Sequence, residues 1–309
     1  MSLRQLHILG TSSQVPTKER NHHGCFLQWD DEGVLMDPGE GTQRQMTLFG
    51  IPASRVTKIL ITHFHGDHCL GLAGVIQRLA LDGATHMVRV FFPASGRDYF
   101  ERMRKVSIFH GPVHLEPIPI EGAGTVHKGN NLEIIALPLD HSAEVFGYRL
   151  QEPDRRTMIP EVLDRFGITG IEAGELSRKG GLEKDGRTVR LEEVSRPRPG
   201  QSAALVMDTR PCLAALDLAK NVDLLIAEAT YLSQDSDLAA SYGHMTAAGS
   251  AKMAAEAGAK LLVLTHFSPR YTDLEPFETE AGAQFQNVII ARDGDRIPVP
   301  KRTRDLRKQ

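Results

Sequence analysis

The sequence has few cysteines, no long apolar run and little net charge. Cys25, Cys69 and Cys212 are odd in number and far apart, which argues against a disulfide framework and favours a reducing compartment. No stretch approaches the roughly 20 apolar residues of a membrane span. The first residues also lack the basic flank and apolar core of a signal peptide. We therefore expect a cytoplasmic protein without a membrane partner.

A formal net charge of −3 provides no overall attraction for nucleic acid, so such a partner must be held by local basic patches. No DNA partner is expected. No repeat or low-complexity tract is present, and 309 residues with 41% hydrophobic content are enough to bury a real core. We expect one main domain over residues 1–309.

Short apolar runs alternate with helix-like stretches, which is typical of sheets covered by helices. Several of these runs end at residues that can bind metals or transfer protons. The expected strands and the residues that follow them are 55–62 before His63, 132–137 before Asp140 and His141, 203–207 before Asp208, 260–265 before His266, 223–227 before Glu228, and 34–36 before Asp37. In open α/β sheets, sites form at the carboxyl ends of strands.

Residues from about 151 to 200 break this rhythm, because they are charged, rich in glycine and proline, and weakly periodic. An unstructured loop of this length would be unusual inside a compact domain unless it served a function or was disordered. We interpret the segment as an inserted, projecting arm. The alternative is a surface insertion without a role.

The densest chemical signal is His63-Phe64-His65-Gly66-Asp67-His68. Zinc binds imidazole and carboxylate ligands, and a catalytic site keeps one position open for water. Alternating His63 and His65 can face one ion, whereas Asp67 and His68, after Gly66, can face a second. A chance cluster is disfavoured because buried unpaired imidazoles and carboxylates carry a desolvation penalty that metals remove.

Two metal sites need further ligands, and His141, Asp208 and His266 follow strands. Asp208 is the natural bridging carboxylate. Paired ions lower the pKa of a bound water and neutralise charge on a phosphoryl or acyl group under attack. An isolated histidine is usually structural or on the surface. We assign a structural or surface role to five histidines: His7, His86, His110, His114 and His127.

The segment from His63 to His68 resembles the H-x-H-x-D-H motif of the metallo-β-lactamase superfamily. This resemblance implies an αββα sandwich and two metal ions per subunit. Histidine at position 65, rather than glutamate, favours zinc hydrolysis over redox di-iron chemistry, although manganese or iron can share such ligands.

Other segments resemble the ribonuclease Z family, the tRNA 3′-processing endonucleases. Residues 10–21 resemble its loop with the pattern P-x-K-x-R-N, and residues 37–43 resemble its segment D-x-G-E-G-T-Q. Residues 228–230 resemble its H-E-A-T motif, with Ala227 in place of the histidine, and residues 242–247 resemble its G-H-x-T-A stretch. Together these motifs cover nearly the whole chain, as in the short form of that family.

The resemblance implies removal of the 3′ trailer from precursor tRNA, with a 3′ hydroxyl left on the tRNA. One zinc would be bound by His63, His65, His141 and Asp208, and the other by Asp67, His68, His266 and the shared Asp208. Asp67 would take the proton of the attacking hydroxide. His244, supported by Glu228, would assist the departing oxygen.

Lys18, Arg20 and Asn21 supply hydrogen-bond donors on a turn, as contacts to the 3′ end of a tRNA require. The alternative is a solvated basic turn. Asp37 could either orient a metal-bound histidine or cap the following helix.

The family resemblance also implies a homodimer in which one arm grips tRNA for the other active site. Residues 160–168 resemble the helical start of that arm, but residues 170–174 replace its usual Gly-Pro turn. Residues 151–200 contain ten Lys and Arg against ten Asp and Glu, so phosphate binding requires these charges to be sorted. Two alternatives remain: a general phosphodiesterase or thioester hydrolase of the same superfamily, and a non-catalytic RNA-binding protein.

Overall fold

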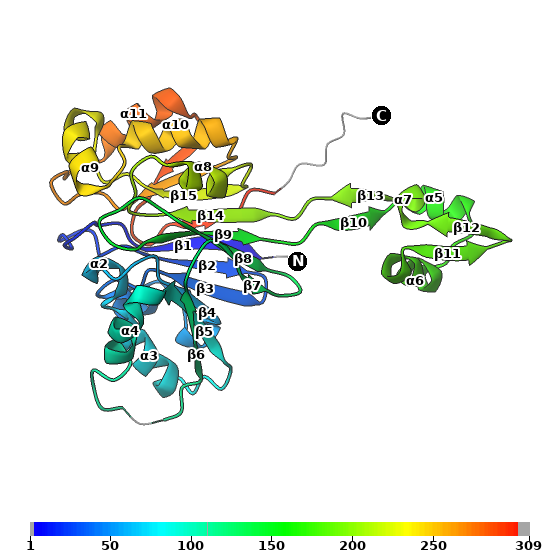
Figure 1. The fold of residues 1–309 in the computed structure, drawn as a ribbon, viewed down its shortest axis with the longest axis horizontal. Helices are drawn as coiled ribbons and strands as arrows, with labels where there is room; N and C mark the ends of the chain where they lie inside the picture. Colours follow the sequence, from blue (N-terminus) through cyan, green and yellow to red (C-terminus); the bar gives the residue numbers. More distant parts are fainter. Residues whose placement is uncertain (1–2, 110, 302–309) are drawn as a thin grey trace.

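Two seven-stranded sheets pack face to face in the computed structural model, which describes residues 3–109 and 111–301 (Figure 1). His110, which we assigned to a structural or surface role, lies outside the described residues. The first sheet has the order β18 (Arg296–Pro298), β1 (Arg4–Gly10), β2 (Gly24–Trp29), β3 (Glu32–Met36), β4 (Lys58–Leu60), β5 (Val88–Pro93) and β6 (Leu115–Ile120). The second has the order β17 (Val288–Ile290), β16 (Leu262–Thr265), β15 (Leu224–Glu228), β14 (Ser202–Val206), β9 (Phe146–Gln151), β8 (Glu133–Pro138) and β7 (Gly124–Lys128).

Helices cover the outer face of each sheet (Figure 1). On the first sheet these are α1 (Thr42–Leu48), α2 (Gly66–Cys69), α3 (Leu72–Leu81) and α4 (Arg97–Met103), with the 3₁₀ turns Ala53–Arg55 and Ala94–Gly96. On the second they are α8 (Leu213–Ala219), α9 (Ser236–Tyr242), α10 (Ala247–Ala257) and α11 (Glu275–Gln284), with the 3₁₀ turn Ser233–Asp235. The predicted αββα sandwich is confirmed.

Three apolar clusters hold these layers together. One lies between the sheets and includes Leu6, Trp29 and Leu205. The other two lie between each sheet and its helices, for example around Leu72 and around Ala251. Because successive side chains of a strand point to opposite faces, a strand covered on both sides must be apolar at nearly every position. This explains the continuous apolar runs before Asp208, Glu228 and His266, because β14, β15 and β16 are buried at every position.

Parallel pairing brings the carboxyl ends of the strands to the same edge. Strands β3 to β6 pair in parallel in one sheet, and β14 to β17 in the other. Soon after three of these strands, Asp37, Asp208 and His266 have positive φ angles of 46°, 40° and 63°. Left-handed backbone is unfavourable for such residues and is concentrated at functional sites. The chain therefore turns sharply at the edge where the candidate ligands lie.

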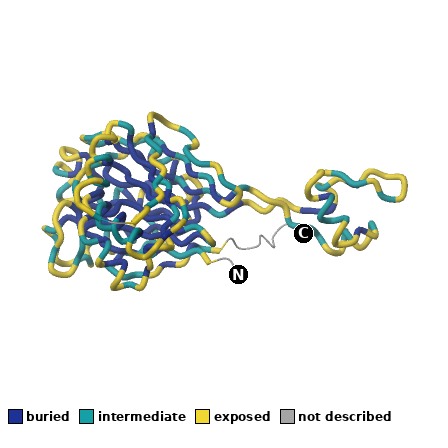
Figure 2. The backbone as a smooth tube through the Cα atoms, turned by 90° about the horizontal axis from the view of Figure 1, so that it is seen from below, coloured by how far each residue is buried: buried dark blue, intermediate teal, exposed yellow. Residues whose placement is uncertain are grey.

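Residues 155–198, called the arm below, project away from the sandwich (Figures 1 and 2). Strands β10 (Arg155–Met158) and β13 (Ser195–Arg198) pair to form its stalk. The tip contains α5 (Pro160–Arg165), α6 (Gly170–Lys179), β11 (Gly181–Lys184), β12 (Arg187–Arg190) and α7 (Leu191–Val194). Its own small core is built on Ile168, Leu176, Val189 and Val194.

The segment that replaces the expected Gly-Pro turn is helical. Gly170 begins α6, and Thr169 and Glu172 form a capping box at its N-terminus. Such reciprocal hydrogen bonds satisfy backbone donors that the first helical turn leaves free. The tip of the arm is therefore a folded unit rather than a loop. In the described ranges, no helix is both long and apolar enough to cross a membrane.

Candidate metal centre

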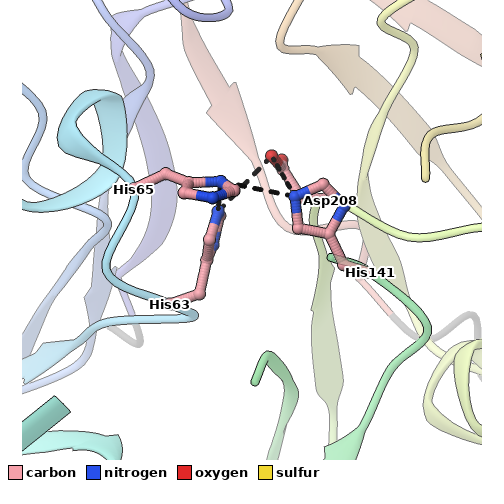
Figure 3. A group of neighbouring side chains, drawn as sticks. All are labelled: His63, His65, His141 and Asp208. Carbon is pink, nitrogen blue, oxygen red and sulfur yellow. Dashed lines mark hydrogen bonds and ion pairs between the residues drawn. The ribbon is translucent and has the colours of Figure 1, made fainter. Parts of the chain in front are cut away.

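The structure brings His63, His65, His141 and Asp208 together at the edge between the two sheets (Figure 3). His63 Nε2 lies 2.9 Å from His65 Nδ1, and His141 Nε2 lies 3.3 Å from the same nitrogen. Asp208 Oδ2 lies 3.5 Å from His63 Nε2 and 3.8 Å from His141 Nε2. These four side chains present three nitrogens and one oxygen to a common point.

Asp67, His68 and His266 form a neighbouring group. The Nε2 atoms of His68 and His266 are 3.0 Å apart, and Asp67 Oδ2 lies 3.4 Å from His266 Nε2. The second oxygen of Asp208, Oδ1, faces this group at 3.3 Å from His266 Nε2 and 3.4 Å from His68 Nε2. One carboxylate thus directs each of its oxygens to a different cluster.

The donor chemistry of both clusters fits a divalent cation. Imidazole nitrogens of both clusters face one another at about 3 Å, and one nitrogen of each neutral ring carries a lone pair that can bind a metal. Asp208 Oδ1 is buried without a hydrogen-bond partner among the described residues. Converging lone pairs of nitrogen and carboxylate oxygen are the environment in which proteins bind zinc and similar ions.

Four of the five clustered histidines have their Nδ1 occupied, which directs Nε2 toward the centre. The partners of Nδ1 are Thr62 Oγ1 for His63 (3.0 Å), Asp37 Oδ2 for His68 (2.9 Å), the carbonyl oxygen of Gly243 for His141 (2.9 Å) and Thr230 Oγ1 for His266 (3.0 Å). His65 differs, because its Nδ1 is the atom that faces the other ligands.

Asp37 orients a histidine rather than capping a helix. Its Oδ1 accepts from the Thr62 backbone at 2.7 Å, and its Oδ2 accepts from Thr62 Oγ1 at 2.8 Å as well as contacting His68. The following helix α1 has Gly41 at its N-cap and no side-chain cap. Asp37 therefore ties the end of β3 to the loop that carries His63 and His68.

Burial and neighbouring charges shift the pKa values of several groups of the metal centre. Burial raises the pKa of Asp208, but His266, His68 and His244 outweigh it and hold that pKa well below its usual range. Burial also opposes protonation of His68, yet Asp208, Asp67 and Asp37 hold its pKa well above its ordinary value. A cation that binds here must displace this proton, so acid weakens metal binding.

His244 and Glu228 form a pair beside the second cluster. His244 Nδ1 lies 3.1 Å from both carboxylate oxygens of Glu228, and both side chains are buried. Burial lowers the pKa of His244, but the charge of Glu228 overrides this and raises it to about 9. His244 also offers a ring nitrogen within 4.8 Å of ligand atoms of Asp208 and His266. His244 can therefore hold a proton at the metal centre.

The structure places Lys18, Arg20 and Asn21 in different surroundings. Lys18 is exposed. The guanidinium of Arg20 donates to the carbonyl oxygens of Ser268 (3.2 Å) and Tyr271 (3.0 Å), and the Asn21 amide donates to the carbonyl oxygen of Glu40 (2.9 Å). Two of the three expected contact residues thus use side-chain donors within the protein.

Sequence reasoning missed several residues of the centre. The ring of His23 is fully buried 5.6 Å from that of His68 and 5.7 Å from that of His266. Thr62 and Thr230 orient ligands, and the Gln14 backbone donates to Asp67 Oδ2 at 2.7 Å. Gln14 and Thr230 stood in recognised motifs, and Thr62 directly precedes His63, but the contacts of His23 and Gln14 join distant segments.

The sequence pattern of the metallo-beta-lactamase superfamily matches residues 24–152. A protein named Ribonuclease Z from Nocardia farcinica is 51% identical over 304 residues, which cover 98% of this chain and 100% of that one. The chain belongs to the ribonuclease Z family. Another Ribonuclease Z, from Salinispora arenicola, is 50% identical over 98% of both chains. As members of the ribonuclease Z family are metal-dependent hydrolases, the chain is an enzyme that uses a divalent metal.

Solved structures agree with the fold. Human tRNase Z, short form, superposes with a TM-score of 0.70 at 24% identity, over 96% of this chain and 100% of that one. A long form RNase Z from yeast also gives 0.70, at 16% identity, over 96% of this chain and 42% of that one. At these identities the likeness concerns the fold, and the ribonuclease Z assignment depends on the sequence relatives.

Proposed function

We propose that this protein is an endoribonuclease that removes the 3′ trailer from precursor tRNA. The observation that carries the proposal is the 51% identity, from end to end, to a protein named Ribonuclease Z. The cut breaks the bond between phosphorus and the 3′ oxygen, so the tRNA keeps a 3′ hydroxyl. We further propose that the enzyme acts in the cytoplasm.

We assign two zinc ions per subunit to the clustered side chains. One would be held by His63, His65, His141 and Asp208, and the other by Asp67, His68, His266 and Asp208. The opposite directions of the two Asp208 oxygens support a shared ligand. When bound, such a pair of cations activates water and neutralises charge on the phosphoryl group. Mn²⁺ or Fe²⁺ could use the same donors.

The protein's own groups handle the protons. Asp67 is positioned by the Gln14 backbone N–H and has a pKa held below its usual range: burial raises it, but the charges of His68 and His266 outweigh burial. Asp67 takes the proton released by the nucleophile. His244 carries a proton at neutral pH because Glu228 favours its charged form, and it delivers that proton to the departing 3′ oxygen.

The loop at residues 16–21 is proposed to contact the 3′ end of the tRNA. Lys18 is exposed and can reach a phosphate. Arg20 and Asn21 contribute by shaping this loop, since their donors join it to residues 268–271 and to Glu40. Exposed backbone groups of the shaped loop complete the contact surface.

The arm is proposed to bind tRNA in a homodimer, where it serves the active site of the partner subunit. Its charges are sorted along its length. The stalk strands contain Arg155, Arg156, Arg196 and Arg198 and no acidic residue, whereas residues 159–194 contain six Lys and Arg against eight Asp and Glu. Phosphate contacts depend on such local basic surface, so the stalk is the tRNA-binding part.

The test uses the zinc-loaded protein and an end-labelled precursor tRNA with a 3′ trailer. A single cut next to the discriminator base, absent in His65→Ala, supports the proposal. A small aryl phosphodiester and a thioester are assayed in parallel. Rapid hydrolysis of either one without tRNA cleavage would instead favour a general phosphodiesterase or a thioester hydrolase.

A further inference from the structure

The arm joins the sandwich through two short crossings, residues 152–154 and 199–201. Beyond them its stalk consists only of β10 and β13, and the tip has a separate small core. A stalk of four residues per strand is roughly 13 Å long, so a pivot of about 10° at its base displaces its far end by about 2 Å, and the tip by more. The base therefore decides where the arm points.

A buried charged cluster occupies this base. Arg4, on β1, places its guanidinium 4.3 Å from the centre of the Trp29 ring. It forms ion pairs with Asp30 at 2.6 Å and with Glu152 at 2.8 Å, and it donates to Gln201 Oε1 at 3.1 Å. The side chains of Arg4 and Glu152 are only 7% and 10% exposed. Five side chains thus converge where the arm leaves the sandwich.

Glu152 also links the two crossings to each other. Its Oε2 accepts from the Gln201 backbone at 3.1 Å, and its Oε1 pairs with Arg198 of the stalk at 3.1 Å. At Gly200 the crossings touch so closely that a Cβ would lie 1.8 Å from the Glu152 carbonyl oxygen. The carboxylate of Glu152 therefore connects both strands of the arm's base.

Arg4 and Glu152 belong to opposite sheets. Arg4 begins β1 of the first sheet, and Glu152 follows β9 of the second. Apolar packing between sheets is not directional, whereas an arginine held by a ring and two carboxylates has a defined orientation. The metal centre also draws its ligands from both sheets. The same pair of layers therefore fixes both the centre and the arm's base.

We propose that Arg4 and Glu152 are positioning residues that set the direction of the arm and thereby the enzyme's affinity for a tRNA-sized substrate. This inference rests on the proposed function, because it assigns the arm to tRNA binding. A small phosphodiester does not span the distance from the metal centre to the arm. Loss of the cluster therefore affects the large substrate alone.

The direct test measures shape without any substrate. Small-angle X-ray scattering of the full-length, zinc-loaded protein compares wild type with Arg4→Met and Glu152→Gln, at the same oligomeric state. Both variants are expected to show a broader distribution of the longest interatomic distances. Superimposable scattering profiles would overturn the proposal.

The kinetic test separates geometry from charge. For precursor tRNA, KM is expected to rise about tenfold in both variants while kcat changes by less than about twofold. Glu152→Gln removes a negative charge and Arg4→Met a positive one, so electrostatic attraction alone would shift KM in opposite directions. A rise in both identifies positioning, and opposite shifts would refute it. Hydrolysis of a small aryl phosphodiester should stay unchanged.

Matched variants control for general destabilisation. Glu32→Gln alters another ion pair, the one between Glu32 and the buried Lys58, in which Glu32 also accepts from Thr57 Oγ1. This variant should lower stability without raising KM. Arg4→Met combined with Glu152→Gln removes both charges of the buried pair but also the pairs with Asp30 and Arg198, so the melting temperature should recover in part while KM stays raised. Arg4→Lys should restore KM in part. A parallel loss of both activities with stability would mean a purely structural role.

The outcomes also separate this inference from the proposed function. If wild type fails to cleave precursor tRNA, the proposed function is wrong, and with it the assignment of tRNA to the arm; scattering still decides whether the cluster orients the arm. If wild type cleaves tRNA and the variants match it in both KM and scattering, only the positioning role is wrong.

Discussion

The sandwich buries three large apolar clusters, whereas the arm buries only four side chains of its own core. The metal-site residues lie at strand ends that are held on both sides, and their partners are spaced at 2.7–3.0 Å. The arm instead extends from two short crossings. The contrast separates two tasks: placing reactive groups to within fractions of an ångström requires dense packing, while reaching across a large substrate requires length.

The largest loss of activity is expected for Asp208→Asn, which alters the metal centre of the sandwich. Loss of the shared carboxylate is expected to reduce hydrolysis of tRNA and of small phosphodiesters alike, by on the order of a thousandfold. Metal content, measured by elemental analysis, should fall below that of wild type. Asp217→Asn, an exposed carboxylate on α8, is the control. Full activity in Asp208→Asn would contradict the assignment.

His244→Asn should lower kcat for tRNA by roughly a hundredfold to a thousandfold, because the departing oxygen loses its proton donor. Metal content should change little. If kcat stays at the wild-type level, His244 is not the acid.

The same variant should also change how the unfolding free energy of the metal-free protein depends on pH. The pKa of His244 is raised from 6.5 to about 9. Its charged form therefore contributes up to about 3 kcal/mol of unfolding free energy below pH 6.5, and this is lost as the pH rises through 9. Urea unfolding at pH 6 and pH 9.5 should show that decline in wild type and a smaller one in His244→Asn.

Replacing residues 155–198 by two glycines removes the arm and leaves the sandwich, so it tests the contribution of the arm alone. The strands on either side pair directly, with Gln151 opposite Ser202, so the sandwich should close and fold. We expect kcat/KM for precursor tRNA to fall by about a hundredfold, with hydrolysis of a small aryl phosphodiester retained. Equal loss of both activities would show that the arm supports the fold.

Leu176→Ala is expected to have the smallest effect on the stability of the sandwich. Leu176 is fully buried in the core of the tip, where truncation should destabilise the arm by about 2–5 kcal/mol. Hydrogen exchange should report faster exchange in residues 160–194 and unchanged protection of β14 and β15. Leu218→Ala, at a buried leucine of α8, is the matched control outside the arm and should leave exchange in residues 160–194 unchanged. Faster exchange throughout the chain after Leu176→Ala would mean that the two parts unfold as one.

Much of the site could be predicted from the sequence, because its residues lie close together in the chain or directly follow apolar strands. The apolar runs predicted sheets covered by helices, and the resemblance of the segment from His63 to His68 to the metallo-β-lactamase motif implied the sandwich, which the structure confirms. The same segment and the runs before His141, Asp208 and His266 also pointed to residues that the structure brings together. Boundaries were less accurate: the expected strand at 55–62 is only Lys58–Leu60. Apolar content marks burial, whereas the ends of pairing depend on the neighbouring strands.

The sequence by itself indicated sheets covered by helices and the set of candidate ligands, because periodicity and short spacings are properties of the chain alone. The sandwich and the ribonuclease Z activity followed from the resemblance of its motifs to those of known families. Only the tertiary structure decided that Asp37 orients His68, that Arg20 and Asn21 use side-chain donors internally, that His23 lies against the centre, and that Arg4 meets Glu152. These contacts join residues far apart in the chain. Their distances follow from how the sheets pack, which no local pattern encodes.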